Sequence, residues 1–112
     1  MGNTTSYSTN DYELVIKISK DLEYLLDTEF HANGKGLHEK INSISKEVGL
    51  SNNLIKKMRY LATIRNKLIH ERGYDMIPDR NIFIKNYEES KEILNQILVT
   101  RNSQLTSKCI IS

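Results

Sequence analysis

The sequence is poor in several residues that mark particular classes of protein. Its single cysteine, Cys109, cannot form a disulfide within the chain, so nothing indicates an oxidising compartment. One proline and five glycines in 112 residues leave room for long helices, and tryptophan is absent. No apolar run approaches the roughly 20 residues that a membrane-spanning helix needs. We therefore expect a helical, cytoplasmic protein.

Both ends of the sequence carry short patterns associated with lipid attachment. Residues 1–6 fit a myristoylation pattern, and residues 109–112 fit a prenylation box. Both patterns act only where eukaryotic transferases are present, and Lys108 is the single basic residue next to the box. The first match is expected to be a chance one, and we expect no membrane partner unless Cys109 is prenylated.

The charge of the chain is nearly balanced. Its net charge is +2 at pH 7 and its pI is about 8.6. This excess permits a polyanionic partner but does not demand one, because nucleic-acid-binding domains usually carry a denser basic stripe. A hydrophobic share of 38% and a charged share of 27% are those of an ordinary soluble domain with one modest core.

Apolar residues recur at helical spacing in four segments. Asn10 and Glu13 form a capping pair ahead of a helix that should reach about residue 30, before Asn33 and Gly34. A second helix should run from about 37 to a stop at Gly49. A third, capped by Ser51, should run to about 72, and a fourth from Asp79 to about 100.

These segments predict the domain organisation. Residues 1–10 are polar and are expected to be a disordered lead-in, and residues 101–112 a polar tail that frays. Residues 11–100 should form one helical domain. Four amphipathic helices with short connections predict an all-α, four-helix up-and-down bundle.

The predicted third helix carries a charge on its apolar side. On a helical wheel its apolar residues fill one continuous arc, and Arg65 falls near the middle of it; the arc consists of Leu54, Ile55, Met58, Leu61, Ala62, Ile64, Leu68 and Ile69. An unpaired buried charge costs several kcal/mol. Arg65 must therefore reach solvent, pair with a carboxylate, or face a cleft completed by a second subunit or an anionic ligand.

Two further polar residues lie at the edge of this arc. Asn66 and His70 are one helical turn apart, with Arg59 beside them, whereas Arg65 and His70 are about 140° apart on the wheel. Two such helices packed across a two-fold axis would present Arg65 and His70 to one phosphate better than a single helix does. In the alternative interpretation, Arg65 pairs inside the chain with Glu23, Glu29 or Glu88, and His70 only stabilises the helix end.

The segment Leu61–His70 resembles the HEPN superfamily (higher eukaryotes and prokaryotes nucleotide-binding domains). The signature of that family is an arginine, often followed by asparagine or another polar residue, and then a histidine after four to six residues. In this chain Arg65 and His70 are separated by four residues, and Asn66 fills the polar slot. The resemblance covers roughly residues 11–100, and outside the motif it rests on the helix pattern.

The resemblance implies a four-helix bundle of the HEPN kind and a metal-independent endoribonuclease that acts as a homodimer. In that chemistry the 2′-hydroxyl of RNA attacks the adjacent phosphate. His70 would be the general acid or base, Arg65 the phosphate clamp, and Asn66 would orient His70 or the scissile phosphate. Weaker contacts with the RNA backbone are assigned to Arg59, Arg72 and Tyr74. Toxin–antitoxin and phage-defence systems are the expected setting, with a possible antitoxin or regulatory protein as partner.

Other kinds of site have little support. His31 and His38 have no cysteine nearby, are expected to be exposed and do not predict a metal site, and residues 34–36 lack the strand and spacing of a phosphate-binding glycine loop. We therefore expect no cofactor. Two alternatives stay open: a non-catalytic HEPN-like dimerisation or nucleotide-binding module, and a plain structural bundle.

Overall fold

The chain folds into four helices. The computed structural model describes residues 7–47 and 49–111, with side chains as far as residue 103. Its helices are α1 (Asp11–Phe30), α2 (Leu37–Ile44), α3 (Asn52–His70) and α4 (Arg80–Ile111), and the described residues contain no strand. The all-α prediction is therefore confirmed.

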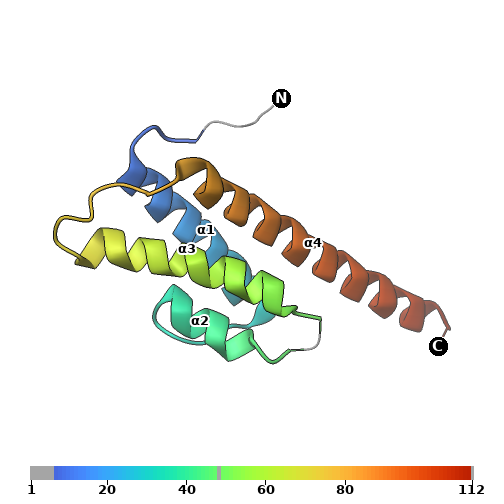
Figure 1. Cartoon of the computed structure of the whole chain (residues 1–112). Helices are drawn as coiled ribbons and strands as arrows, with labels where there is room; N and C mark the ends of the chain where they lie inside the picture. The colour runs from blue at the N-terminus through green and yellow to red at the C-terminus, as the bar shows by residue number, and fades with distance from the viewer. Residues whose placement is uncertain (1–6, 48, 112) are drawn as a thin grey trace.

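The three long helices lie side by side. As Figure 1 shows, α3 runs in the opposite direction to both α1 and α4, and the short α2 lies against α3 on the side away from α4. The predicted up-and-down order, in which α1 and α3 would be parallel, is therefore not observed. Both α1 and α3 contact all three of the other helices. The C-terminal part of α4 projects past the rest of the bundle (Figure 1).

All four helices contribute to one core. The apolar stripes predicted from the sequence point inward, and burying each large aliphatic or aromatic side chain contributes about 1.5–3 kcal/mol. The fully buried side chains include Leu14, Leu22, Leu26, Ile41, Leu54, Met58, Leu61, Phe83 and Leu94.

The predicted helix starts are confirmed. The side chain of Asn10 accepts a hydrogen bond from the backbone N–H of Glu13 at 3.0 Å, and Ser51 accepts one from Leu54 at 3.1 Å. Asp79 caps α4 by accepting from Ile82 at 3.1 Å. Each cap satisfies a backbone donor that the first turn of a helix leaves free.

The predicted helix ends are accurate for α1 and less accurate for the later helices. Helix α1 ends at Phe30 as predicted, with the left-handed residue His31 (φ 55°) as its C-cap ahead of Asn33 and Gly34. Helix α2 ends at Ile44 and not at Gly49, because the next backbone hydrogen bonds, from Ser45 to Asn42 at 3.3 Å and from Glu47 to Ile44 at 3.0 Å, span three residues and form turns. Helix α3 ends at His70, where residue 72 was predicted.

The largest difference concerns the end of α4. The sequence predicted fraying after about residue 100, but the backbone is helical through Ile111. No proline or glycine interrupts residues 80–111. In addition, Arg101 binds Glu47 at 3.2 Å and lies over the ring of Phe30 at 5.2 Å, which fastens the helix to the bundle just beyond the predicted end.

Candidate functional site

Helix α3 carries the three residues of the predicted motif. Arg65 and Asn66 are both half-buried, and the Nη1 atom of Arg65 donates a hydrogen bond to Oδ1 of Asn66 at 3.1 Å. The sequence predicted that Asn66 would orient His70 or the phosphate. Within one chain its carbonyl oxygen instead orients Arg65, and its amide N–H groups stay available as donors.

His70 is the last residue of α3 and is exposed. Among the described residues its ring makes no hydrogen bond and no ion pair, so one chain does not join it to Arg65 or Asn66. This agrees with the wide angle between Arg65 and His70 on the helical wheel. A single subunit therefore presents an exposed imidazole and a half-buried guanidinium on neighbouring faces of one helix.

Arg65 has no carboxylate partner in the part of the chain that the structure describes. Of the three predicted candidates, Glu88 accepts a hydrogen bond from Tyr7 at 2.8 Å, and Glu23 and Glu29 form no ion pair. The interpretation of Arg65 as one half of an internal ion pair is therefore not supported. Its charge is balanced only by solvent and by the amide of Asn66.

The apolar arc around Arg65 is not fully covered. Most of its members are buried, but Ile69, one turn after Arg65, is 41% exposed. The observed contacts between α2 and α3 lie at Arg59 and Thr63, before this last stretch of the helix. The end of α3 thus leaves part of its apolar side open beside a guanidinium.

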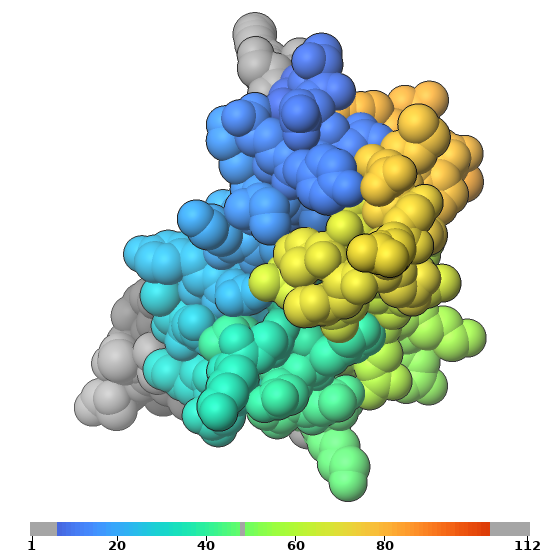
Figure 2. Space-filling model, turned by 90° about the vertical axis from the view of Figure 1, so that its left-hand side faces the viewer, coloured from blue at the N-terminus to red at the C-terminus, as the bar shows by residue number. Residues whose placement is uncertain are grey.

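The loop that follows His70 is held against the start of α1. Asp11 accepts a hydrogen bond from the backbone N–H of Ile77 at 2.9 Å and pairs with Arg80 at 3.4 Å. Figure 2 shows the start of α1, in blue, against this loop, in yellow. These contacts hold the loop of residues 71–79 against the bundle.

Two weaker RNA-binding candidates lie in this loop. Tyr74 is half-buried, and the ammonium group of Lys67 lies 5.8 Å from the centre of its ring. Arg72 is exposed. Tyr74 is therefore packed beside the end of α3, whereas Arg72 is free to contact a ligand.

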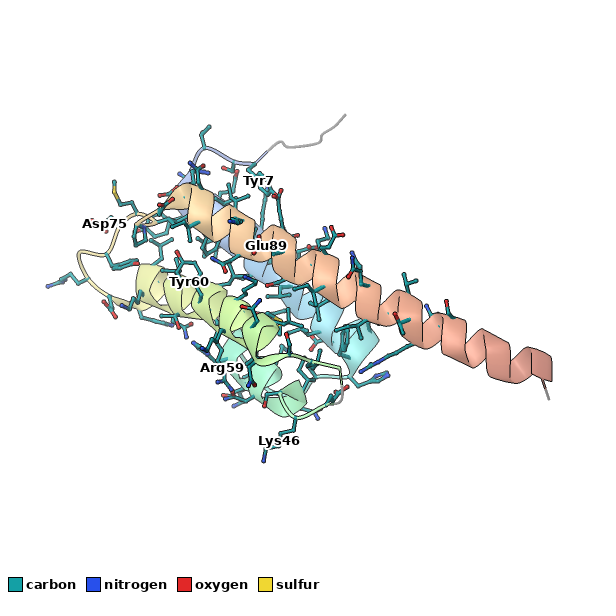
Figure 3. All side chains as sticks on the ribbon, turned by 45° about the vertical axis from the view of Figure 1, so that its right-hand side comes forward. Tyr7, Lys46, Arg59, Tyr60, Asp75 and Glu89 are labelled. Carbon is teal, nitrogen blue, oxygen red and sulfur yellow. The ribbon has the colours of Figure 1, made fainter. Side chains whose placement is uncertain are left out.

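Arg59 lies on the side of α3 that faces α2, as Figure 3 shows. Its Nη2 atom donates to Oδ1 of Asn42 at 2.8 Å, and one turn further along α3 the hydroxyl of Thr63 lies 3.4 Å from Nε2 of His38. His38 was predicted to be exposed and without a role. It is half-buried and belongs to the contact between α2 and α3.

The charge of the chain is strongly divided between its helices. Helix α3 contains five Lys and Arg residues and no Asp or Glu, whereas α1 contains six acidic residues and two lysines. Of the five cations on α3, Lys57 is the one paired with a carboxylate among the described residues, Glu89 at 3.0 Å. The sequence interpretation missed this excess of basic residues on α3 because it considered the charge of the whole chain, although counting charges helix by helix reveals it.

A second polar cluster joins α1 and α4 away from the motif. The hydroxyl of Tyr87 donates to Asp21, and Lys91 lies 3.5 Å from the same carboxylate. Burial, with the hydrogen bond to Glu88 next, raises the pKa of Tyr7 to about 12, and burial followed by the bond to Asp21 raises the pKa of Tyr87 well above its ordinary value. Both phenols stay neutral at physiological pH, so the cluster holds α1 and α4 together through hydrogen bonds and an ion pair.

The hollows on the surface do not coincide with the motif. One of about 550 Å³ is lined by Lys57, Glu88, Glu89 and Glu92, and another of about 600 Å³ by residues that include Glu47 and Arg101. Carboxylates dominate the first, which disfavours a polyanion there. The site worth considering is therefore the open, basic surface of α3.

Neither a metal-binding cluster nor a membrane-spanning helix is found among the described residues. They contain no cluster of His, Cys, Asp and Glu side chains suited to holding a metal ion, and no helix among them is long and apolar enough to cross a membrane. The patterns at residues 1–6 and at 109–112 lie outside the described side chains. Comparison with protein-family models, with curated proteins and with solved structures finds no match to this chain.

Proposed function

We propose that this protein is an endoribonuclease of the HEPN kind that acts as a homodimer. The observation that carries the proposal is the state of Arg65: it is half-buried, hydrogen-bonded to Asn66, and free of any carboxylate among the described residues. A guanidinium held in this way keeps its affinity for an anion. It lies five residues before an exposed histidine on a helix whose charged side chains are all basic.

The residue types suit cleavage without a metal ion. In the proposed step, the 2′-oxygen of RNA forms a bond to the adjacent phosphorus, and the bond from phosphorus to the 5′-oxygen breaks. His70 takes the proton of the attacking hydroxyl or supplies one to the departing oxygen. Arg65 stabilises the added negative charge on the phosphoryl oxygens. The products carry a 2′,3′-cyclic phosphate and a 5′-hydroxyl.

A dimer would bring the two groups together. Within one chain Arg65 and His70 point in different directions, so each site needs Arg65 from one copy and His70 from the other. Large apolar side chains are exposed at the same end of the molecule, where they can be buried by a second copy: Tyr12, Ile69 and Met76. The start of α1 and the loop that carry two of them are tied together by the hydrogen bond from Tyr12 to Asp75.

The biological setting belongs to the proposal too. A small nuclease with an open site on its surface would be harmful in the cell unless a partner controlled it. We therefore place the protein in a toxin–antitoxin, phage-defence or related stress system, where an antitoxin or regulatory protein would cover the surface of α3.

The deciding experiment compares RNA cleavage by the wild-type protein and by His70→Ala, in the presence of EDTA. We expect the substitution to lower the cleavage rate by about 10²- to 10⁴-fold and the wild-type products to end in a cyclic phosphate. Because His70 is exposed, the variant should fold normally. Equal cleavage by the two proteins would refute the proposal. RNA or nucleotide binding by a verified dimer without cleavage would favour the non-catalytic module.

A further inference from the structure

Four side chains at the junction of α2 and α3 form a polar strip that the proposed chemistry leaves unused. His38 and Asn42 come from α2, and Arg59 and Thr63 come from α3. Two contacts join them in pairs, Arg59 to Asn42 at 2.8 Å and Thr63 to His38 at 3.4 Å. We call these four residues the α2–α3 strip. In Figure 3, Arg59 and Lys46 lie on this side of the molecule, away from Glu89 on α4.

The α2–α3 strip leads directly to the motif. Arg59, Thr63, Asn66 and His70 follow one another at intervals of four, three and four residues, so they share one face of α3. From Arg59 to His70 the helix rises about 16 Å. This distance is long enough for several nucleotides of an extended strand. The strip and His70 therefore form one continuous polar surface.

The electrostatics of the strip favour a polyanion. Four cations of α3 have no carboxylate partner among the described residues: Lys56, Arg59, Arg65 and Lys67. The acidic residues of α1 that form ion pairs do so with α2, with α4 or within α1. Arg59 is exposed, and its observed side-chain partner is a neutral amide. A guanidinium has five N–H donors, so several stay available for phosphate oxygens.

We propose that the α2–α3 strip binds the sugar–phosphate backbone of single-stranded RNA on one side of the cleaved phosphate, with Arg59 as its main phosphate contact. This inference rests on the proposed function, and it adds the path of the substrate and its strandedness. Attack by a 2′-hydroxyl in line with the leaving oxygen requires a backbone free to turn at the cleavage point, which a duplex restrains. The strip is one helix wide and offers N–H and O–H donors without a row of large aromatic rings, so it suits a sugar–phosphate backbone better than stacked bases.

The test measures binding separately from cleavage. Fluorescence anisotropy would record the affinity of a labelled 2′-O-methyl RNA of about twelve nucleotides, which cannot be cut by this chemistry, at several salt concentrations. The proteins would be the wild type, Arg59→Gln and a control, Lys20→Gln. Lys20 is exposed on α1 and forms no ion pair among the described residues, so the control removes the same charge from another face.

We expect Arg59→Gln to weaken binding about 5- to 20-fold and to reduce the slope of log affinity against log salt by about 0.7, with Lys20→Gln close to the wild type. Equal affinities and slopes for the two variants would overturn the inference. So would equally effective competition by a polyglutamate peptide of the same charge, or tighter binding of a duplex.

The binding test and the cleavage test can fail independently of each other. If the wild-type protein cuts no RNA but Arg59→Gln still loses affinity and salt slope, the binding surface stands and the nuclease fails. If the wild type cuts RNA and Arg59→Gln changes neither the binding of the uncleavable strand nor KM, the nuclease stands and the strip is refuted. Thermal unfolding of each variant would verify that the exposed substitutions leave the fold intact.

Discussion

At the scale of single residues, Arg65 is the one that folding explains least. It lies on the apolar side of α3, where a leucine side chain could pack equally well. No carboxylate among the described residues forms an ion pair with it. Half-burial of a guanidinium costs free energy that its single hydrogen bond to Asn66 offsets only in part. A residue that folding does not require, at a position where it costs stability, indicates a function.

The contrast between stability and activity tests this argument. Arg65→Leu should leave the free energy of unfolding within about 1 kcal/mol of the wild-type value or raise it, because an apolar side chain suits the arc and Asn66 can still be solvated. The same substitution should lower the cleavage rate by about 10²- to 10³-fold. Urea unfolding and RNA cleavage, measured on the same preparation and at one protein concentration, give the two values.

Arg65→Lys is the matched control for charge. It keeps the positive charge but loses the planar fork of donors, so its activity should lie between those of the wild type and Arg65→Leu. If Arg65→Leu unfolds several kcal/mol more easily than the wild type, Arg65 is a structural residue and the argument from its position is wrong.

At the scale of elements, the connection between α1 and α2 decides where α2 meets α3. Gly34 has φ 129°, a conformation that side chains rarely adopt, and a Cβ atom built there would lie 2.4 Å from Cβ of Glu39. The N–H of Lys35 also donates to the carboxylate of Glu39 at 3.1 Å. This close approach of the loop to α2 orients the helix that carries His38 and Asn42.

We therefore expect Gly34→Ala to lower the free energy of unfolding by about 2 kcal/mol or more, since the new methyl group has no space and the backbone is strained. Gly36→Ala is the control: its φ is −122° and a Cβ there meets no atom within 4 Å. Thermal or urea unfolding of the two variants measures the difference. Equal stability of the two would show that the loop can be rebuilt without cost.

The helix starts could be predicted from the sequence, and several helix ends could not. The side chains of Asn10 and Ser51 each accept a hydrogen bond from a backbone N–H three residues later, so the local sequence pattern alone predicts where these helices start. The end of α2 is marked by backbone turns at Ser45 and Glu47, and the continuation of α4 is supported by the contacts of Arg101 with Glu47 and Phe30. The partners of Arg101 are distant in sequence, and the turns after α2 have only a weak sequence pattern. The hydrophobic periodicity alone therefore does not predict either feature.

The candidate site shows the same division. The motif and the apolar arc around it were visible in the spacing of α3, as was the poor alignment of Arg65 with His70. The hydrogen bond between Arg65 and Asn66 and the half-buried contact of His38 with Thr63 required the structure, because they depend on side-chain direction and on the placement of α2. The excess of basic residues on α3 needed only a count of charges within the helix.

At the scale of the whole molecule, the division of charge and the uncovered end of α3 point in the same direction. Acidic residues of α1 pair with Lys40 of α2 and with Arg80 and Lys91 of α4, and four of the five cations of α3 have no carboxylate partner among the described residues. The exposed Tyr12, Ile69 and Met76 lie at the end of the molecule where α3 finishes. In the proposed dimer, this end of the molecule would offer positive charge to the substrate and apolar side chains to a second copy.

A mixed dimer tests whether the site is shared between copies. Arg65→Ala and His70→Ala chains with different affinity tags would be produced together, and the mixed dimer purified through both tags. If each site takes Arg65 from one copy and His70 from the other, one of the two sites is intact, and the mixed dimer should recover about half of the wild-type rate. Both parent homodimers should stay at their low rates.

The control is a mixed dimer in which one chain carries both substitutions and the other is wild type. It contains the same number of altered residues, but no site with Arg65 and His70 on opposite copies, so its rate should stay as low as those of the homodimers. If this control were the active species and the first mixed dimer inactive, Arg65 and His70 would act from the same chain. Because the two dimers differ only in how identical substitutions are distributed, loss of folding or of dimerisation cannot produce the difference between them, and the comparison isolates the geometry of the site.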